Sequence, residues 1–98
     1  MAATKTENAV TGRSDAEAAF AAEGCSRSRA WSNGPGDTYA THGHAYHKVL
    51  FCLSGSIVFH TDDGNIPLHA GDRLDLEPNT DHSAIVGPEG VECVEASR

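Results

Sequence analysis

From Cys25 onward, clusters of turn-forming residues divide the sequence into short segments, and this spacing leaves few folds open to the chain. The turn signals recur roughly every 8–12 residues, and the segments between them alternate apolar and polar side chains. Gly64 can supply the positive φ that a tight hairpin demands. The clusters are Ser32–Gly36, Asp62–Asn65, Glu77–Asp81 and Gly87–Gly90. About eight short strands joined in this way predict an all-β sandwich or barrel. The expected strands include residues 47–53, 56–61, 73–76, 82–86 and 91–96.

The first 24 residues differ from the rest of the chain. Residues 1–12 are polar or small and show no periodicity, so we expect a flexible lead-in. Ser14 and Glu17 have the spacing of a capping box, an alanine-rich segment follows, and Gly24 suits the left-handed end of a helix. We expect a short helix that buries Phe20 against an end or edge of the barrel. The predicted division is residues 1–24, a lead-in with a helix, and residues 25–98, a β-barrel domain.

Size and charge exclude several classes of protein. A chain of 98 residues has room for one domain, and no apolar run approaches the ~20 residues of a membrane span. Seven Lys and Arg against 14 Asp and Glu argue against nucleic acid or an anionic membrane as the partner. Open sheet edges and a thin core favour a homodimer. Three widely spaced cysteines and the lack of an apolar secretion signal predict a cytoplasmic protein.

A histidine cluster is the main candidate for chemistry. Three of the six histidines fall within six residues, and His42 and His44 would share one face of a strand, within reach of one ion. His47 would point to the opposite face and could join them only through a β-bulge. His82 follows a turn and shares its register with two apolar residues, which places it on an inward face. Histidines that converge inside one small barrel would form a site for a divalent transition metal.

Two segments of the chain resemble the two sequence motifs of the cupin superfamily. The spacing of the first motif is found in Gly36-x5-His42-x-His44-x3-Lys48-x6-Gly55, and a segment similar to the second is Gly71-Asp72-x4-Glu77-x-Asn79-x2-His82. The resemblance covers about residues 30–96 and implies a small single-domain cupin, an antiparallel jelly-roll β-barrel with a site inside it. It also implies a divalent metal held by the matching histidines, His42, His44 and His82.

The sequence departs from the cupin pattern where the family has a glutamate ligand. Lys48 takes that position, and an ammonium group cannot coordinate a metal. We expect His47 to complete a set of four histidine ligands. Two alternatives stay open: the site has three ligands, or Lys48 faces a metal-free cavity and pairs with an anionic ligand. The residues do not distinguish Zn, Fe, Mn, Ni and Cu.

A small-molecule ligand is expected in the barrel, with Lys48, Tyr39 and Tyr46 as the residues that contact it. Structural roles are expected for His60 and His69, which lie beside a turn. The resemblance implies a metal-dependent oxygenase or isomerase that acts on a small molecule. The alternative is a non-catalytic module that binds or senses a small ligand. The histidine set favours an enzyme, whereas the missing glutamate favours the binding module.

Overall fold

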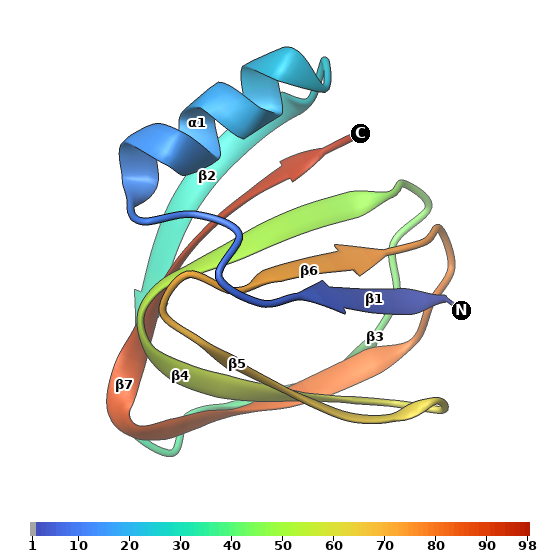
Figure 1. Cartoon of the computed structure of the whole chain (residues 1–98). Helices are drawn as coiled ribbons and strands as arrows, with labels where there is room; N and C mark the ends of the chain where they lie inside the picture. The colour runs from blue at the N-terminus through green and yellow to red at the C-terminus, as the bar shows by residue number, and fades with distance from the viewer. Residues whose placement is uncertain (1) are drawn as a thin grey trace.

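A computed structural model describes residues 2–98, which form one helix and seven strands (Figure 1). In chain order the elements are β1 (Ala3–Thr6), α1 (Arg13–Ala22), β2 (Ser26–Asn33), β3 (Thr38–His42), β4 (Lys48–Thr61), β5 (Gly64–His69), β6 (Arg73–Leu76) and β7 (His82–Ser97). All strand pairs are antiparallel. The main path of the sheet is β1-β6-β4-β7-β2, while β3 also pairs with β7 and β5 with β4. The all-β prediction is confirmed.

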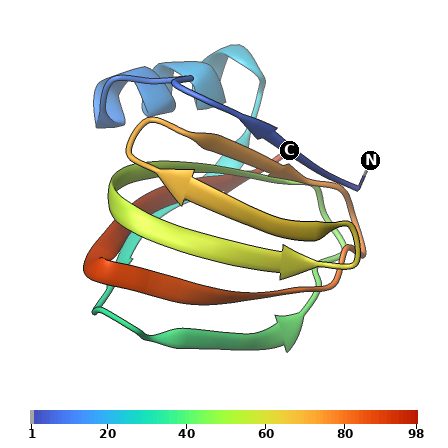
Figure 2. The same cartoon turned by 60° about the horizontal axis from the view of Figure 1, so that its bottom comes forward.

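The two longest strands, β4 and β7, bend and so give the sheet two layers. The first half of β4 pairs with β6 and the end of β7, and its second half pairs with β5 and the start of β7. The helix-covered layer is therefore β1-β6-β4-β7-β2, with α1 beside it in Figure 1. The open layer is β5-β4-β7-β3, whose strands lie side by side in Figure 2.

The bends occur where the sequence predicts breaks between strands. Residues 47–53 and 56–61 were expected as separate strands, and so were residues 82–86 and 91–96, but each pair forms one continuous strand. Register shifts occur on either side of Ser54 and Gly55 in β4. Gly55 and Gly90 have φ of 70° and 78°, a conformation that bends a strand and that side chains disfavour. These glycines therefore mark corners in β4 and β7.

Alternation along β4 feeds two hydrophobic clusters. Leu50 and Cys52 point between the layers. Val49 and Phe51 point outward beneath α1. The ring centroid of Phe20 in α1 lies 5.4 Å from that of Phe51, and Phe20 is only 4% exposed. The helix docks through Phe20 as expected, but it covers the outer face of the sheet, where an end or edge of the barrel was expected. The outer cluster keeps the helix on the face opposite the interior of the barrel.

The expected flexible lead-in contains a strand, which corrects the prediction for this segment. Residues 3–6 form β1 and pair with β6, with Ala3 opposite Leu76. Further along, the backbone N–H groups of Ala9 and Val10 donate to the carbonyl oxygen of Gly71. The pairing depends on the backbone edge that β6 offers, so four residues without apolar alternation carry no signal of it.

The predicted capping box is also absent. The helix begins at Arg13 after Gly12, and no side chain caps its first turn from the N-cap position. Instead, the backbone N–H and the hydroxyl of Thr11 donate to Asp15 Oδ2 at 2.9 Å and 2.6 Å. The expected end of the helix is correct in conformation, since Gly24 has a φ of 69°.

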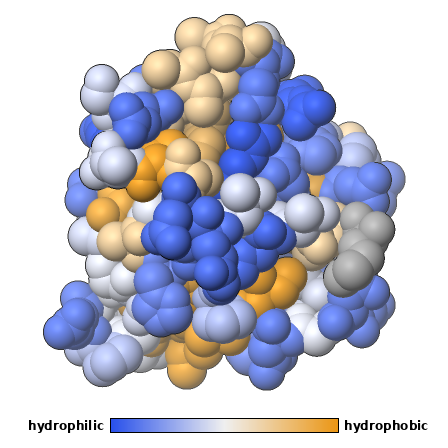
Figure 3. Space-filling view, viewed as in Figure 1, coloured by the Kyte–Doolittle hydropathy of each residue, from blue (hydrophilic) through white to orange (hydrophobic). Residues whose placement is uncertain are grey.

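On the face of the molecule shown in Figure 3, apolar residues form small areas separated by polar ones. Among residues 2–98, Tyr46 and Ile85 are the large hydrophobic side chains classed as exposed. No helix in the described part of the chain is long and apolar enough to cross a membrane.

Candidate metal centre

Strand pairing brings three of the predicted ligands together. His42 is the last residue of β3, His82 is the first residue of β7, and the two are direct partners in the antiparallel register. His44 follows in the connection between β3 and β4. The three histidines, called the triad below, therefore meet at the end of the open layer where β3 ends and β7 begins.

Two contacts fix the loop that carries His44. The backbone N–H of Asn79 donates to the carbonyl oxygen of His44 at 2.6 Å, which ties this loop to the turn before His82. Gly43 lies against the same turn, and a Cβ atom there would come within 2.8 Å of an Asp81 carboxylate oxygen. A glycine between the two loop histidines therefore allows a close approach to the turn.

The imidazole rings of the triad form a compact cluster. Ring centroids are 4.9 Å apart for His42 and His44, 4.4 Å for His42 and His82, and 5.5 Å for His44 and His82. One nitrogen of each ring lies within 4.8 Å of the others. Bonds of ~2.1 Å to a common ion place the ligand atoms about 3.0–3.4 Å apart, so the three nitrogens would have to move closer together to hold one ion.

Hydrogen bonds at Nδ1 leave the Nε2 atoms of His42 and His82 free to bind a metal. His42 Nδ1 lies 2.8 Å from the carbonyl oxygen of Ala40, and His82 Nδ1 lies 2.9 Å from that of Thr80. A carbonyl oxygen only accepts, so each Nδ1 carries the proton and each Nε2 keeps its lone pair. The Nε2 atom of His44 is buried and has no hydrogen-bond partner among residues 2–98. Such an orphaned nitrogen fits a metal ligand.

Electrostatics favour the neutral form of two rings of the triad. Burial lowers the pKa of His44, and the charge of Lys48 lowers it further. Burial also lowers the pKa of His82, although its hydrogen bond to Thr80 opposes the change. Neutral imidazole is the form that binds metal ions, so these two rings are ready to ligate at neutral pH.

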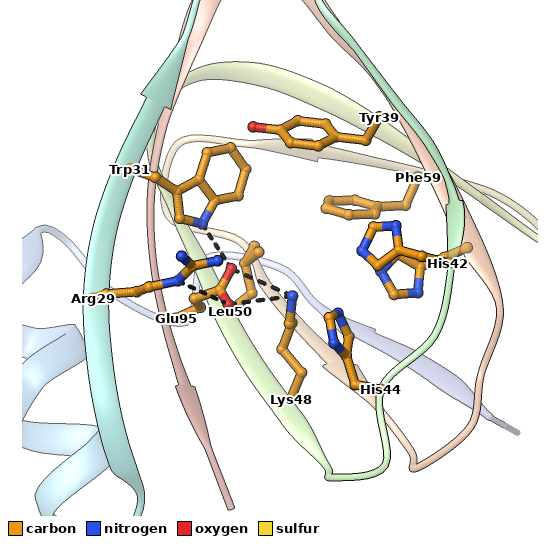
Figure 4. Close-up of a pocket in the computed structure, with 10 residues that line it drawn as sticks. Arg29, Trp31, Tyr39, His42, His44, Lys48, Leu50, Phe59 and Glu95 are labelled. Carbon is orange, nitrogen blue, oxygen red and sulfur yellow. Dashed lines mark hydrogen bonds and ion pairs between the residues drawn. The ribbon is translucent and has the colours of Figure 1, made fainter.

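The triad forms one side of a cavity of about 270 Å³, drawn in Figure 4. Aromatic rings line other parts of it. Trp31 and Tyr39 pack edge to face with centroids 5.5 Å apart, and the ring of Phe59 lies 6.0 Å from that of His82. The cavity thus combines three metal-type ligands with flat apolar walls.

Lys48 faces this cavity and is paired with a carboxylate from β7. Its Nζ lies 3.2 Å from Glu95 Oε2, and the two residues are only 7% and 5% exposed. Glu95 also accepts a hydrogen bond of 2.7 Å from Trp31 Nε1, and Arg29 Nε lies 3.6 Å from its other oxygen. In Figure 4 the ammonium group lies between the carboxylate and His44. The position of the missing glutamate therefore holds an inward-facing cation with its own counter-ion.

The two tyrosines expected to contact a ligand have different environments. Tyr39 lines the cavity, and its hydroxyl donates to Asn33 Oδ1. Tyr46 is 38% exposed and stacks on His44, with ring centroids 4.9 Å apart and planes at 29°. Tyr46 therefore supports a ring of the triad and is not among the residues that line the cavity.

His47 lies apart from the triad, which corrects the expectation of a fourth histidine ligand. Its Nε2 is 2.9 Å from Asp75 Oδ1, and it lines a separate groove with Arg73. The required bulge does not form, because β4 begins at Lys48 and pairs in regular register with β6. Residues 47 and 48 consequently face opposite sides, and the lysine takes the inward one.

Glu95, Trp31 and Arg29 were missed by the sequence reasoning. Glu95 lies on the same face of β7 as buried Cys93, so a carboxylate in an apolar register was an available signal of a buried ion pair. Arg29 is the direct strand partner of Glu95. Most of β2 is exposed, so its own pattern does not show which residues face the cavity.

Comparisons with known proteins agree with this fold. The cupin domain family matches residues 31–95. The chain is 43% identical over 54 residues to quercetin 2,3-dioxygenase of Bacillus subtilis (strain 168), a match that covers 53% of this chain but 16% of that protein. An RmlC-like cupin from Shewanella frigidimarina NCIMB 400 has a similar structure, with a TM-score of 0.65, 23% identity, and coverage of 71% of this chain and 62% of the other. A double-stranded β-helix protein from Klebsiella pneumoniae is also similar, with a TM-score of 0.64, 27% identity, and coverage of 71% and 60%.

Proposed function

Because this chain belongs to the cupin domain family, we propose that it holds a divalent transition metal in its barrel and binds a small molecule beside it. The ligands in this proposal are His42, His44 and His82. The observation that carries it is the buried Nε2 of His44, which lacks a partner among residues 2–98 and lies beside two imidazoles whose own Nε2 atoms are free. Three ligands leave coordination positions open for a substrate.

The reaction class we propose first is that of a metal-dependent oxygenase, with an isomerase as the related possibility. The similarity to a quercetin 2,3-dioxygenase over half of this chain supports it. The metal would supply Lewis-acid or redox chemistry at a bound substrate oxygen. Within the chain, Lys48 would hold negative charge on the substrate, while the rings of Trp31 and Phe59 would exclude water from its apolar part.

A non-catalytic binding module is the second candidate, and one observation favours it. Glu95 is the carboxylate that lines the cavity, and both of its oxygens already face Trp31, Lys48 or Arg29. Neither oxygen is therefore left unpaired to accept a proton from a substrate. Proton transfer by a side chain therefore has no evident agent among the described residues of the cavity, and a reaction would depend on the metal.

Metal analysis tests the proposal. The purified protein is loaded in turn with Zn²⁺, Fe²⁺, Mn²⁺, Ni²⁺ or Cu²⁺, and the bound metal is quantified after desalting. We expect one ion per chain, and weakening by roughly 100-fold or more in His44→Ala and His82→Ala, since loss of outer-sphere contacts alone costs 10–100-fold. His60→Ala and His69→Ala are matched controls that should keep the metal. Equal loss in all four variants would show unspecific binding and contradict the site.

Oxygen consumption separates the two candidate functions. The loaded protein is tested with a panel of small phenols, diketones and thiols, and consumption that disappears in His82→Ala supports the oxygenase. Tight binding of a panel member without turnover supports the binding module.

We also propose that the protein is a homodimer. The strands β2 and β3 each have one partner strand, β7, so their other edges are open to a second chain. Light scattering at tens of micromolar should give twice the chain mass of 10.3 kDa. A single species at the chain mass would contradict this proposal.

A further inference from the structure

The cavity wall that faces the triad carries an oriented positive charge. The ammonium group of Lys48 has three N–H donors. Its hydrogen-bond and ion-pair contacts among residues 2–98 are with Glu95, at 3.2 Å and 3.4 Å to the two oxygens. In Figure 4 this group lies on the triad side of the carboxylate. At least one N–H therefore remains for a ligand that lies between Lys48 and the triad.

Glu95 is a positioning residue for this ammonium group. The carboxylate is fixed from two sides, by Trp31 Nε1 at 2.7 Å and by Arg29 Nε at 3.6 Å. Both Lys48 and Glu95 are more than nine-tenths buried, so neither side chain is free to leave for solvent. The ammonium group is thus held in place before any ligand arrives.

The charges of the cavity do not cancel. Lys48 and Arg29 bring two positive charges to its lining and Glu95 brings one negative charge. One positive charge remains uncompensated, in a protein whose formal charge is −7. A divalent metal on the triad would add to this excess. An anionic ligand would offset it, whereas a cationic ligand would be repelled.

The size and the walls of the cavity limit the rest of the ligand. Its volume of about 270 Å³ lies slightly below the usual range for small-molecule sites, which is about 300 to 1,000 Å³. The walls include the rings of Trp31, Tyr39 and Phe59, against which a planar unsaturated body can pack in offset or edge-on contact. A ligand with one ring and one acidic group satisfies both conditions.

We propose that the ligand of this cavity is a small planar carboxylate, whose acidic group lies between the triad and Lys48 and whose ring lies against the aromatic walls. The inference rests on the metal site proposed above and names the substrate class for it. Lys48, which takes the position of a metal-binding glutamate in the family pattern, acts here as a ligand-binding residue. Glu95 and Trp31 set its position.

The protein provides its own probe for this proposal. Trp31 is the single tryptophan of the chain, it lines the cavity and it is bonded to Glu95, so its fluorescence should respond to an occupant. The Zn²⁺-loaded full chain, with its metal content measured, is titrated with benzoate, with its neutral isostere benzamide, and with the non-planar cyclohexanecarboxylate. We expect benzoate to bind roughly tenfold or more tightly than benzamide, and several-fold more tightly than cyclohexanecarboxylate.

Substitutions of Lys48 test whether this residue causes the preference for benzoate over benzamide. Lys48→Met should keep the bound Zn²⁺, lower the affinity for benzoate by roughly tenfold and leave that for benzamide unchanged, while Lys48→Arg should restore part of the loss. If Lys48→Met is unstable because Glu95 loses its counter-ion, the double variant Lys48→Met/Glu95→Gln removes both charges and should show the same change. His60→Ala, outside the cavity, is the control with unchanged affinities.

The outcomes separate this inference from the proposed function. Bound Zn²⁺ with equal affinities for benzoate and benzamide overturns the carboxylate assignment and leaves the metal site standing. The same holds if the preference survives unchanged in Lys48→Met and in the double variant. Loss of Zn²⁺ binding in the native sequence overturns both, because the acidic group then has no metal to face.

Discussion

Gly55 is the residue on which the bend of β4 depends most. Its φ is 70°, and a Cβ atom at this position would collide with the carbonyl group of Gly90 on the facing strand. Gly55→Ala should lower the free energy of unfolding by about 2–4 kcal/mol, because it combines left-handed strain with a backbone clash. Urea denaturation followed by circular dichroism measures the change.

Gly34→Ala is the matched control for this substitution. Gly34 has no left-handed φ, and a Cβ atom there meets an Asp37 oxygen at 3.6 Å, an ordinary contact distance. We expect a change within about 0.5 kcal/mol at this surface position. Equal destabilisation by the two substitutions would mean that the corner in β4 does not depend on its glycine.

At the level of single residues, the sequence predicts the side chains whose position follows from strand parity. His42, His44 and His82 were expected to converge, and they do, because a turn and a direct strand pair place them together. Parity alone does not decide where a strand begins, so His47 was expected to join through a bulge that does not form. Glu95 was missed because its partners come from β2 and β4, which its own neighbours do not reveal.

Among the elements, α1 should contribute stability and leave the metal site unchanged. Phe20 packs on Phe51 in the outer cluster, on the opposite face of the sheet from the cavity. Phe20→Ala should cost about 3 kcal/mol or more, as is usual for a buried phenylalanine. The metal content per chain should equal that of the native protein. Loss of metal without loss of stability would place the helix in the site.

An ionic cluster ties the end of α1 to β6, and it should weaken in acid. Arg73 donates to Glu23 at 2.6 Å and 2.7 Å and to Asp75 at 2.8 Å, with His47 and Arg98 beside them. The hydrogen bonds from Arg73 lower the pKa of Glu23. Burial alone would raise the pKa of Asp75, but hydrogen bonds from Arg73 and His47 outweigh it, and the pKa is lowered.

The lowered pKa values of Glu23 and Asp75 determine how the stability of the fold changes with pH. A carboxyl group with a lowered pKa in the folded state stabilises the fold above its unfolded pKa, and this contribution is lost as pH falls through the folded value. Arg73→Gln should therefore cost about 1–3 kcal/mol at pH 7. The difference from the native protein should shrink below the ordinary values of 4.5 for Glu23 and 3.8 for Asp75. Urea denaturation at pH 7 and near pH 3 measures it, and an equal difference at both would contradict the role of the cluster.

The elements that the sequence predicts well are bounded by turn-forming residues and show a regular alternation of apolar side chains. Residues 73–76 form β6 as expected, with Leu74 and Leu76 on one face. By contrast, β1 was not expected. It is stabilised by pairing with the edge of β6, and the four residues of β1 carry no pattern that reveals this partner. The corners in β4 and β7 were interpreted as breaks, since a glycine in a strand pattern signals a bend and a turn alike.

In the whole molecule, a metal on the triad would link segments that are distant in the sequence. The ligands come from the end of β3, the following loop and the start of β7, so the complete site exists only in the folded chain. A ligand that binds the folded state alone at 100 times its Kd stabilises it by about 2.7 kcal/mol. For a domain of this size, the melting temperature should rise by about 10–20 °C.

Calorimetry with and without Zn²⁺ tests this expectation. The rise should reverse on addition of a chelator, and it should be absent in His82→Ala, which lacks a ligand but keeps the strand pairing of β3 and β7. His60→Ala should retain the rise in melting temperature, because the His60 ring is hydrogen-bonded to Asn65 at the hairpin of β4 and β5, outside the triad. If His82→Ala showed the same rise as the native protein, the stabilising ion would be bound elsewhere, and the triad would be a histidine cluster without a metal.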